Sequence, residues 1–161
     1  MSESELVRIL DQLQREHDGD PWHGSPMMAI LEGVDAARAA RKPIAGGHSI
    51  WELVLHVTGW KREVARRLGG APAGEPAAGD WPAVGEPTEA RWRAAVEDLG
   101  AAHRELTAAV QSLAESRLFE PTNDPRSRPL GTGVSHYVLL HGAVQHDVYH
   151  AGQIALLSKA D

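Results

Sequence analysis

The stretch over residues 141–157 constrains the fold most, because its periodicity predicts one long helix that carries three histidines. Two of them, His146 and His150, are four residues apart, so they lie on one helical face about 6 Å apart along the axis. Two imidazole nitrogens at that spacing can bind one metal ion at roughly 2.0 to 2.1 Å each. Apolar residues on the same face put the pair on the buried side. A buried imidazole needs a partner for each nitrogen, so the pair requires hydrogen-bonding neighbours or a shared cation.

Apolar residues recur at helical spacing in four long stretches, which predicts four principal helices. Serines or a threonine that can cap free backbone N–H groups precede several of them. The predicted helices begin at Ser2 or Ser4 and stop at Asp18, run from about Ser49 to Leu68, start at Thr88, and run from about Val134 to Lys159.

Shorter elements are expected between the long helices. Ser25 and Pro26 predict the start of an additional short helix after the first, and residues 35–41 predict another helical turn. Two segments rich in Pro and Gly, near 69–87 and 121–133, are predicted connections, the first with an anchoring contact at Trp81. No stretch of alternating polarity is long enough to predict a strand. We therefore expect an all-α chain, a four-helix bundle that forms a single domain over residues 1–161.

Composition excludes several classes of function. The chain has no cysteine, so it can form neither a disulfide nor a thiolate zinc site, and any thiol must come from outside. Its formal net charge is −6, and no cluster of Lys and Arg alternates with aromatic residues, so nucleic acid is not an expected partner. The N-terminus lacks a basic start followed by an apolar run, and no apolar stretch could cross a bilayer. We expect a cytoplasmic protein without a membrane partner.

His56 is the predicted third member of the histidine site. Because the chain has 9 histidines, the spacing of His146 and His150 is not specific by itself. In helical bundles, however, metal sites are built in the core from side chains on facing helices. His56 lies within the apolar face of the second long helix, so it is well placed to complete a site with three nitrogen ligands.

Two motifs carry a resemblance to a known family. They are His48-Ser-Ile-Trp-Glu-Leu-Val-Leu-His56, followed by Trp60, and Gln145-His-Asp-Val-Tyr-His-Ala-Gly-Gln-Ile154. Together with Trp22-His-Gly, they make the chain resemble the DinB/YfiT-like superfamily of four-helix-bundle metalloproteins, which is unrelated to the DNA polymerase that shares the name. The resemblance covers nearly the whole chain.

The resemblance implies a metal site and, less specifically, a reaction. One histidine of the second helix and an H-x-x-x-H pair of the fourth hold the ion in that family, and these map onto His56, His146 and His150. Characterised relatives include S-transferases and isomerases that use a low-molecular-weight thiol such as bacillithiol or mycothiol. Three neutral imidazoles leave at least one metal position open, which is typical of catalytic zinc. Zinc is the first choice of ion, and imidazole also suits nickel and iron; manganese is a further alternative.

Several other residues are candidates to form hydrogen bonds with the ligands of the ion or to contact a substrate. Gln153, one turn beyond His150 on the same face, is the preferred partner of a ligand. His103, His23 and Trp60 are further candidates, each with a competing interpretation as a packing or capping residue. Asp147 points about 100° away from the site face, so no direct contact with the ion is expected. His48 and His141 are predicted not to be ligands, and His17, His136 and His141 to lie at the surface or at packing edges.

Three functions fit these patterns. The first is a metal-dependent enzyme, either a thiol-dependent S-transferase or a hydrolase, that acts on a small molecule. The second is a non-catalytic protein for small-molecule binding or stress response that contains a metal. The third is a structural bundle whose histidines bond each other and water. A homodimer is also considered, because Trp51 and Trp81 would suit an interface.

Overall fold

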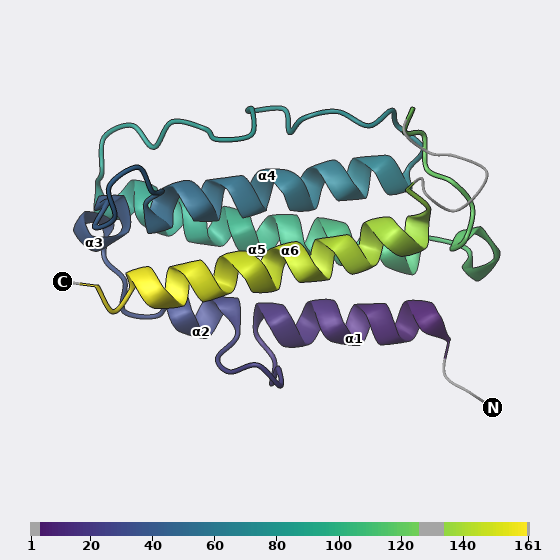
Figure 1. Cartoon of the computed structure of the whole chain (residues 1–161), viewed down its shortest axis with the longest axis horizontal. Helices are drawn as coiled ribbons and strands as arrows, with labels where there is room; N and C mark the ends of the chain where they lie inside the picture. The colour runs from purple at the N-terminus through teal and green to yellow at the C-terminus, as the bar shows by residue number, and fades with distance from the viewer. Residues whose placement is uncertain (1–3, 126–133, 161) are drawn as a thin grey trace.

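The four longest helices lie side by side along the long axis of the molecule, as the computed structural model shows for residues 4–125 and 134–160 (Figure 1). Helix α4 packs against both α5 and α6, and α1 packs against α5 and α6. Among the described residues, bridge pairing is limited to one isolated bridge between Pro121 and Ser135, so the all-α prediction is confirmed. The long helices are α1 (Glu5–His17), α4 (Ile50–Leu68), α5 (Glu89–Gln111) and α6 (His136–Leu157).

Two short helices and one 3-10 turn join these long helices. They are α2 (Met27–Leu31), α3 (Ala36–Ala40) and η1 (Glu115–Arg117). Helix α2 starts one residue later than expected, with Pro26 as its N-cap. Helix α3 occupies the turn predicted over 35–41, because the Asp35 side chain accepts a hydrogen bond from the backbone N–H of Arg38.

The start of α4 is set by a reciprocal pair of hydrogen bonds. The Ser49 hydroxyl accepts from the backbone N–H of Glu52, and the Glu52 carboxylate accepts from the backbone N–H of Ser49. This capping box satisfies two backbone donors that a helix would otherwise leave free. It also sets the helical phase, which turns His56 and Val57 toward the interior.

The apolar core divides into two clusters along the long axis. One lies around α2, α3 and the first half of α4, and the other around α1, the end of α4 and the first half of α6. Trp51 belongs to the first cluster and is only 2% exposed, so the expectation that it would suit an interface is wrong. It packs against Trp92, with ring centroids 5.2 Å apart. None of the helices in the described part of the chain combines the length and apolar character needed to span a membrane.

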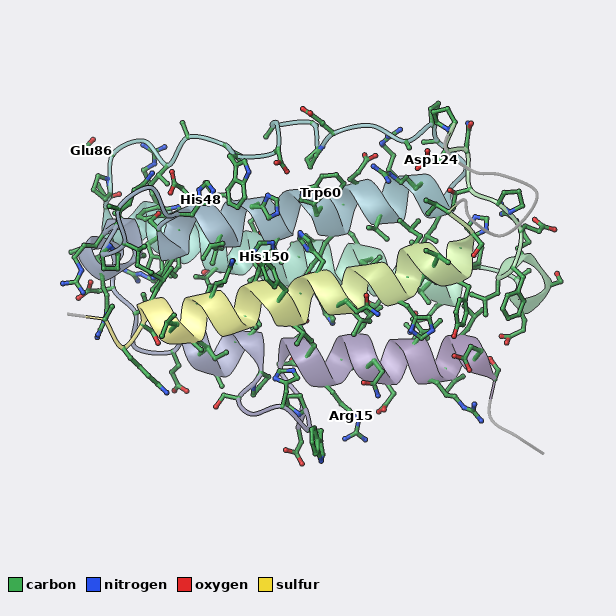
Figure 2. The ribbon with its side chains drawn as sticks, viewed as in Figure 1. Arg15, His48, Trp60, Glu86, Asp124 and His150 are labelled. Atoms are coloured by element: carbon green, nitrogen blue, oxygen red, sulfur yellow. The ribbon has the colours of Figure 1, made fainter. Side chains whose placement is uncertain are left out.

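The connection between α4 and α5 runs back along the outer side of α4 (Figure 1). Arg66 and Arg67 hold its first part by donating hydrogen bonds to the carbonyl oxygens of Pro72 and Gly74. In Figure 2, His48 and Trp60 lie on the side of α4 that faces this connection. The segment thereby brings loop residues over the middle of α4.

Candidate metal centre

Three histidines from two facing helices meet in the interior. His56 comes from α4, and His146 and His150 come from α6. One nitrogen from each ring lies within 4.8 Å of the others, and the Nε2 atoms of His56 and His146 are 3.0 Å apart. Two nitrogens that each lie about 2.1 Å from one ion are at most about 4.2 Å apart, and the 3.0 Å separation is within that limit, so His56 does meet the α6 pair as predicted.

The second nitrogen has a hydrogen-bond acceptor in two of the three rings. His56 Nδ1 is 2.8 Å from the backbone oxygen of Asp80, and His150 Nδ1 is 2.7 Å from Oε1 of Gln153. His146 Nδ1 is 3.6 Å from a carboxylate oxygen of Asp147. A carbonyl oxygen only accepts, so we assign the ring proton of His56 and of His150 to Nδ1. The Nε2 atoms of these two rings are then able to bind an ion, and one nitrogen of His146 lies close enough to share it.

A cation fits this donor set. The Nε2 atoms of His56 and His146 are close enough to share a hydrogen bond or, when the His146 proton is on Nδ1, to bind one ion between them. Burial lowers the pKa of His56 below its usual value and lowers that of His150 to about 4, so both rings are neutral at pH 7. Neutral imidazole is the form that binds a metal ion. The residues therefore fit a divalent ion held by three nitrogens.

The α4–α5 connection covers one side of this centre with Asp80 and Trp81. The Trp81 ring stacks on the His56 ring, with ring centroids 4.0 Å apart. It also stacks on the His48 ring, with ring centroids 3.5 Å apart. Trp60 Nε1 donates to a carboxylate oxygen of Asp80 at 2.7 Å, and an Asp80 oxygen also lies 3.2 Å from His56 Nδ1. The connection thus fixes the His56 ring and shields it from water. The anchoring contact predicted for Trp81 is present, whereas Asp80 carried no sequence signal.

A buried charge cluster lies beside His146. Lys61 of α4 pairs with Asp147 of α6, and its ammonium group is 3.7 Å from a carboxylate oxygen of Glu16 on α1. All three side chains are almost completely buried. Asp147 does point away from the histidine centre, as expected, but it contacts the outer nitrogen of His146. Lys61 was missed, although its position between Val57 and Val64 on the apolar stripe of α4 was a usable signal.

The four further candidates separate into two groups. Gln153 and Trp60 lie at the centre, Gln153 through its bond to His150 and Trp60 edge-on to His56 at 6.3 Å. His103 does not reach it: the ring is buried against His17, with ring centroids 3.9 Å apart. His23 is exposed and lines a surface depression at α2 and the end of α6.

The remaining histidines are outside the centre. His48 stacks on Trp81, and His141 lies 3.5 Å from a carboxylate oxygen of Glu5, so neither joins the three-histidine group. The expectation that His17 and His136 lie at the surface or at packing edges is wrong, because both are buried. His136 closes the start of α6 with its Nδ1 facing the backbone oxygens of Arg117 and Glu120. His17 is buried because α1 turns it onto α5.

Comparison with known proteins places this arrangement in a family. The chain matches the family model described as the DinB superfamily over residues 11–154. It belongs to the DinB superfamily. The matched region contains all three histidines of the centre, and both the family and the geometry of the three rings are compatible with a metal-binding protein. Neither the comparison with curated proteins nor that with solved structures gave a significant match.

Proposed function

We propose that this DinB superfamily protein is a metal-dependent enzyme whose four long helices form a bundle around a divalent ion held by His56, His146 and His150. The meeting of one nitrogen from each ring, with the His56 and His150 rings oriented by acceptors on their Nδ1 atoms, carries the proposal. Three imidazoles leave a tetrahedral ion one position for a water molecule or substrate, which is the pattern of catalytic sites. Zinc is the preferred ion, with nickel, iron and manganese as alternatives.

The side chains around the centre each have a role in this proposal. Asp80 and Gln153 orient the rings of His56 and His150 and increase the basicity of their ligating nitrogens, and the Asp147 carboxylate lies 3.6 Å from Nδ1 of His146. Trp81 covers the His56 ring and limits the access of water from the side of the α4–α5 connection. When bound, the ion supplies Lewis acidity that lowers the pKa of a water molecule or thiol and polarises a carbonyl group.

The absence of cysteine gives slight support to one reaction class. The chain has none, so a sulfur nucleophile has to come from an external low-molecular-weight thiol. Thiol-dependent S-transfer to a small electrophile is therefore the first reaction to test, and hydrolysis of a small substrate is the second.

The experiment combines metal analysis with an activity screen. Purified, tag-free protein is analysed for metal, reconstituted with zinc, and screened with thiols and small electrophiles. We expect close to one ion per chain, and turnover that is lost in His56→Ala but retained in His141→Ala, a variant of α6 outside the centre. Absence of bound metal at saturating zinc would contradict the proposal.

A non-catalytic role is the alternative, and the cleft beside His146 favours it enough to be tested in the same screen. A protein that only holds a small molecule with the help of its metal would bind ligand with a measurable Kd and show no turnover with any thiol or water. Saturable binding without product would select this alternative.

A further inference from the structure

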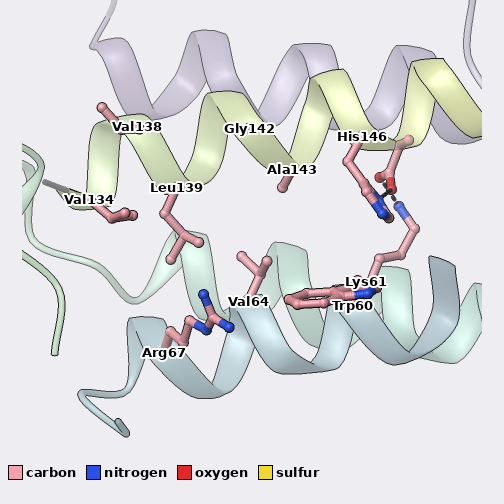
Figure 3. Close-up of a pocket in the computed structure, with 11 residues that line it drawn as sticks. Trp60, Lys61, Val64, Arg67, Val134, Val138, Leu139, Gly142, Ala143 and His146 are labelled. Atoms are coloured by element: carbon pink, nitrogen blue, oxygen red, sulfur yellow. Dashed lines mark hydrogen bonds and ion pairs between the residues drawn. The ribbon is translucent and has the colours of Figure 1, made fainter. Parts of the chain in front are cut away.

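A cleft between α4 and α6 opens beside the three-histidine centre. Its volume is about 230 Å³, below the range of roughly 300 to 1,000 Å³ that is typical of pockets for drug-sized ligands. Figure 3 shows His146 and Lys61 at one end of the cleft and Arg67 toward the other. Lys61 is paired there with Asp147, which also lines the cleft. A ligand in the cleft would therefore be small, with one end at His146.

The walls of the cleft are apolar between these two ends. Trp60 and Val64 of α4 face Leu139 and Ala143 of α6 across it. Trp60 and Arg67 are seven residues apart on α4, which corresponds to roughly 10 Å along the helix. An extended chain of five or six carbons is shorter than this and fits between the two ends of the cleft, and burying it would be favourable because it removes apolar surface from water.

Arg67 gives the far end of the cleft a fixed positive charge. Its side chain is buried to 7% exposure, Nε donates to Glu63 at 2.7 Å, and Nη2 donates to the oxygen of Gly74 at 2.6 Å. The guanidinium carbon lies 5.5 Å from the centre of the Trp60 ring. Within the described residues, Nη1 has no hydrogen-bond partner. The guanidinium group is therefore held in place, and its Nη1 is left to donate to a ligand.

The charge at this end is not neutralised by its neighbours. Glu63 is the only carboxylate bonded to Arg67 in the described part of the chain, and it also accepts two hydrogen bonds from Arg66. Two guanidinium groups therefore share one carboxylate, which leaves a net positive charge. Arg66 is half-exposed and does not line the cleft. Of these two guanidinium groups, an anion in the cleft would meet that of Arg67.

We infer that the cleft binds a small organic acid, with its apolar body between Trp60 and Leu139, its carboxylate on Arg67 Nη1, and its other end at the histidine centre. This inference rests on the proposed function for the role of that other end, since the reacting group of the acid would lie at the ion. The binding of the acid itself needs only the cleft and Arg67.

The test measures binding of hexanoate and 1-hexanol to EDTA-treated protein by NMR titration. The two probes share an apolar chain and differ in the charged end. A hydrogen bond between charged groups at a partly desolvated site should make hexanoate bind about tenfold more tightly than 1-hexanol. Arg67→Gln should reduce this preference to about twofold or less, Arg67→Lys should restore part of it, and the matched control Arg66→Gln should keep it. Equal binding of the two probes to wild type would overturn the inference.

A second variant does not depend on changing Arg67. Gly142 lines the cleft, and a Cβ added there meets no atom within 4 Å. Gly142→Leu should therefore fold and should weaken both probes about tenfold or more by filling the cleft. Unchanged binding would place the probes elsewhere and overturn the inference.

Repeating the titration with zinc separates this inference from the proposed function. A hexanoate preference that appears only with zinc and is insensitive to Arg67→Gln would mean that the carboxylate binds the ion, which overturns the role of Arg67 and leaves the metal site intact. A preference that persists in EDTA and depends on Arg67 would support the cleft even if no ion bound.

Discussion

Lys61 of α4 and Asp147 of α6 form an ion pair in the interior of the molecule, and Asp147 also lies against His146. Burial alone would lower the pKa of Lys61, but Asp147 and Glu16 raise it above its usual value. Burial would likewise raise the pKa of Asp147, but Lys61 lowers it. The pair is therefore charged at neutral pH and connects two helices beside the metal centre.

Removing one member of this pair should be strongly destabilising. Lys61→Met leaves Asp147 as an uncompensated buried carboxylate, and such changes cost about 3 to 5 kcal/mol. Replacing both residues, in Lys61→Met with Asp147→Leu, should recover most of that loss because both charges of the pair are removed and burial keeps the remaining Glu16 protonated at pH 7. The measurement is urea unfolding at pH 7 in EDTA, so that metal binding does not contribute.

The neighbouring Arg62 is the matched control. It pairs with Asp98 and Glu105 at the surface, where an ion pair contributes about 0 to 1 kcal/mol. Arg62→Met should therefore change the unfolding free energy much less than Lys61→Met. Similar losses of unfolding free energy in the two variants would show that the cost of Lys61→Met does not come from the burial of its ion pair.

Local sequence patterns predicted the helices and the three-histidine centre. The spacing of His146 and His150 places both on one face of α6 whatever surrounds the helix, and His56 follows from the apolar face of α4. Residues that meet only through tertiary packing were harder to predict. Asp80 and Trp81 lie in a segment without periodicity, so nothing local indicates that it returns to cover α4.

Buried charges were missed for a different reason. Lys61, Glu16 and Asp147 lie on buried faces of their helices, but hydropathy patterns treat a charged residue as a solvent-facing one. Each is tolerated in the core only because the partners come from other helices. The stacking of His17 on His103 is equally non-local, since it depends on how α1 packs on α5.

Gln153 should contribute to metal affinity without touching the ion. Its Oε1 accepts from His150 Nδ1, which holds the ring with Nε2 toward the centre. Loss of such a partner typically weakens metal binding by about 10- to 100-fold. We expect that weakening in Gln153→Ala and near-normal affinity in Gln153→Glu, which keeps an acceptor, when zinc affinity is measured by competition with a chromophoric chelator.

Gln145 provides the control for that measurement. It lies on the exposed face of α6 and forms no part of the centre. Gln145→Ala should leave zinc affinity within about twofold of wild type. If both alanine variants weakened zinc binding equally, the effect would come from α6 as a whole and not from the bond to His150.

Metal binding should stabilise the folded protein in a way that EDTA removes. An ion that binds only the folded state adds about 2.7 kcal/mol at a free concentration one hundred times its Kd. The apolar clusters remain without the ion, so the protein should stay folded at 25 °C. Thermal melting should show an EDTA-sensitive Tm in wild type and His141→Ala, and none in His150→Ala. An identical Tm for wild type with and without EDTA would favour the structural interpretation of the histidines.

The buried pair His17 and His103 should make the protein less stable in mild acid. Burial lowers the pKa of His17 to about 4 and that of His103 to about 3. In the unfolded chain, histidine takes up a proton below about pH 6.5. The unfolded state therefore binds more protons than the folded state, and the free energy of unfolding falls as pH drops below 6.5. The loss at pH 5 should be on the order of 1 to 2 kcal/mol for each histidine.

Measuring this effect requires a comparison that cancels the other charges near the two rings. Lys61, Asp147, Arg104 and Asp18 act on the pair. The pKa of nearby Glu16 is raised to about 8 by burial and by Asp147, so its contribution has the opposite sign: stability from protonated Glu16 is lost as pH rises from about 4.5 to 8.

The decisive quantity is therefore the difference in unfolding free energy between pH 7 and pH 5, compared between wild type and His103→Leu in EDTA. Removing His103 removes one titrating group, so the loss in acid should shrink by about 1 to 2 kcal/mol even if the variant is less stable at pH 7. His23→Gln, at an exposed position, should leave the difference unchanged. An equal acid loss in His103→Leu and wild type would mean that the buried pair does not control the response to pH, and would leave the metal ligands as the groups to examine.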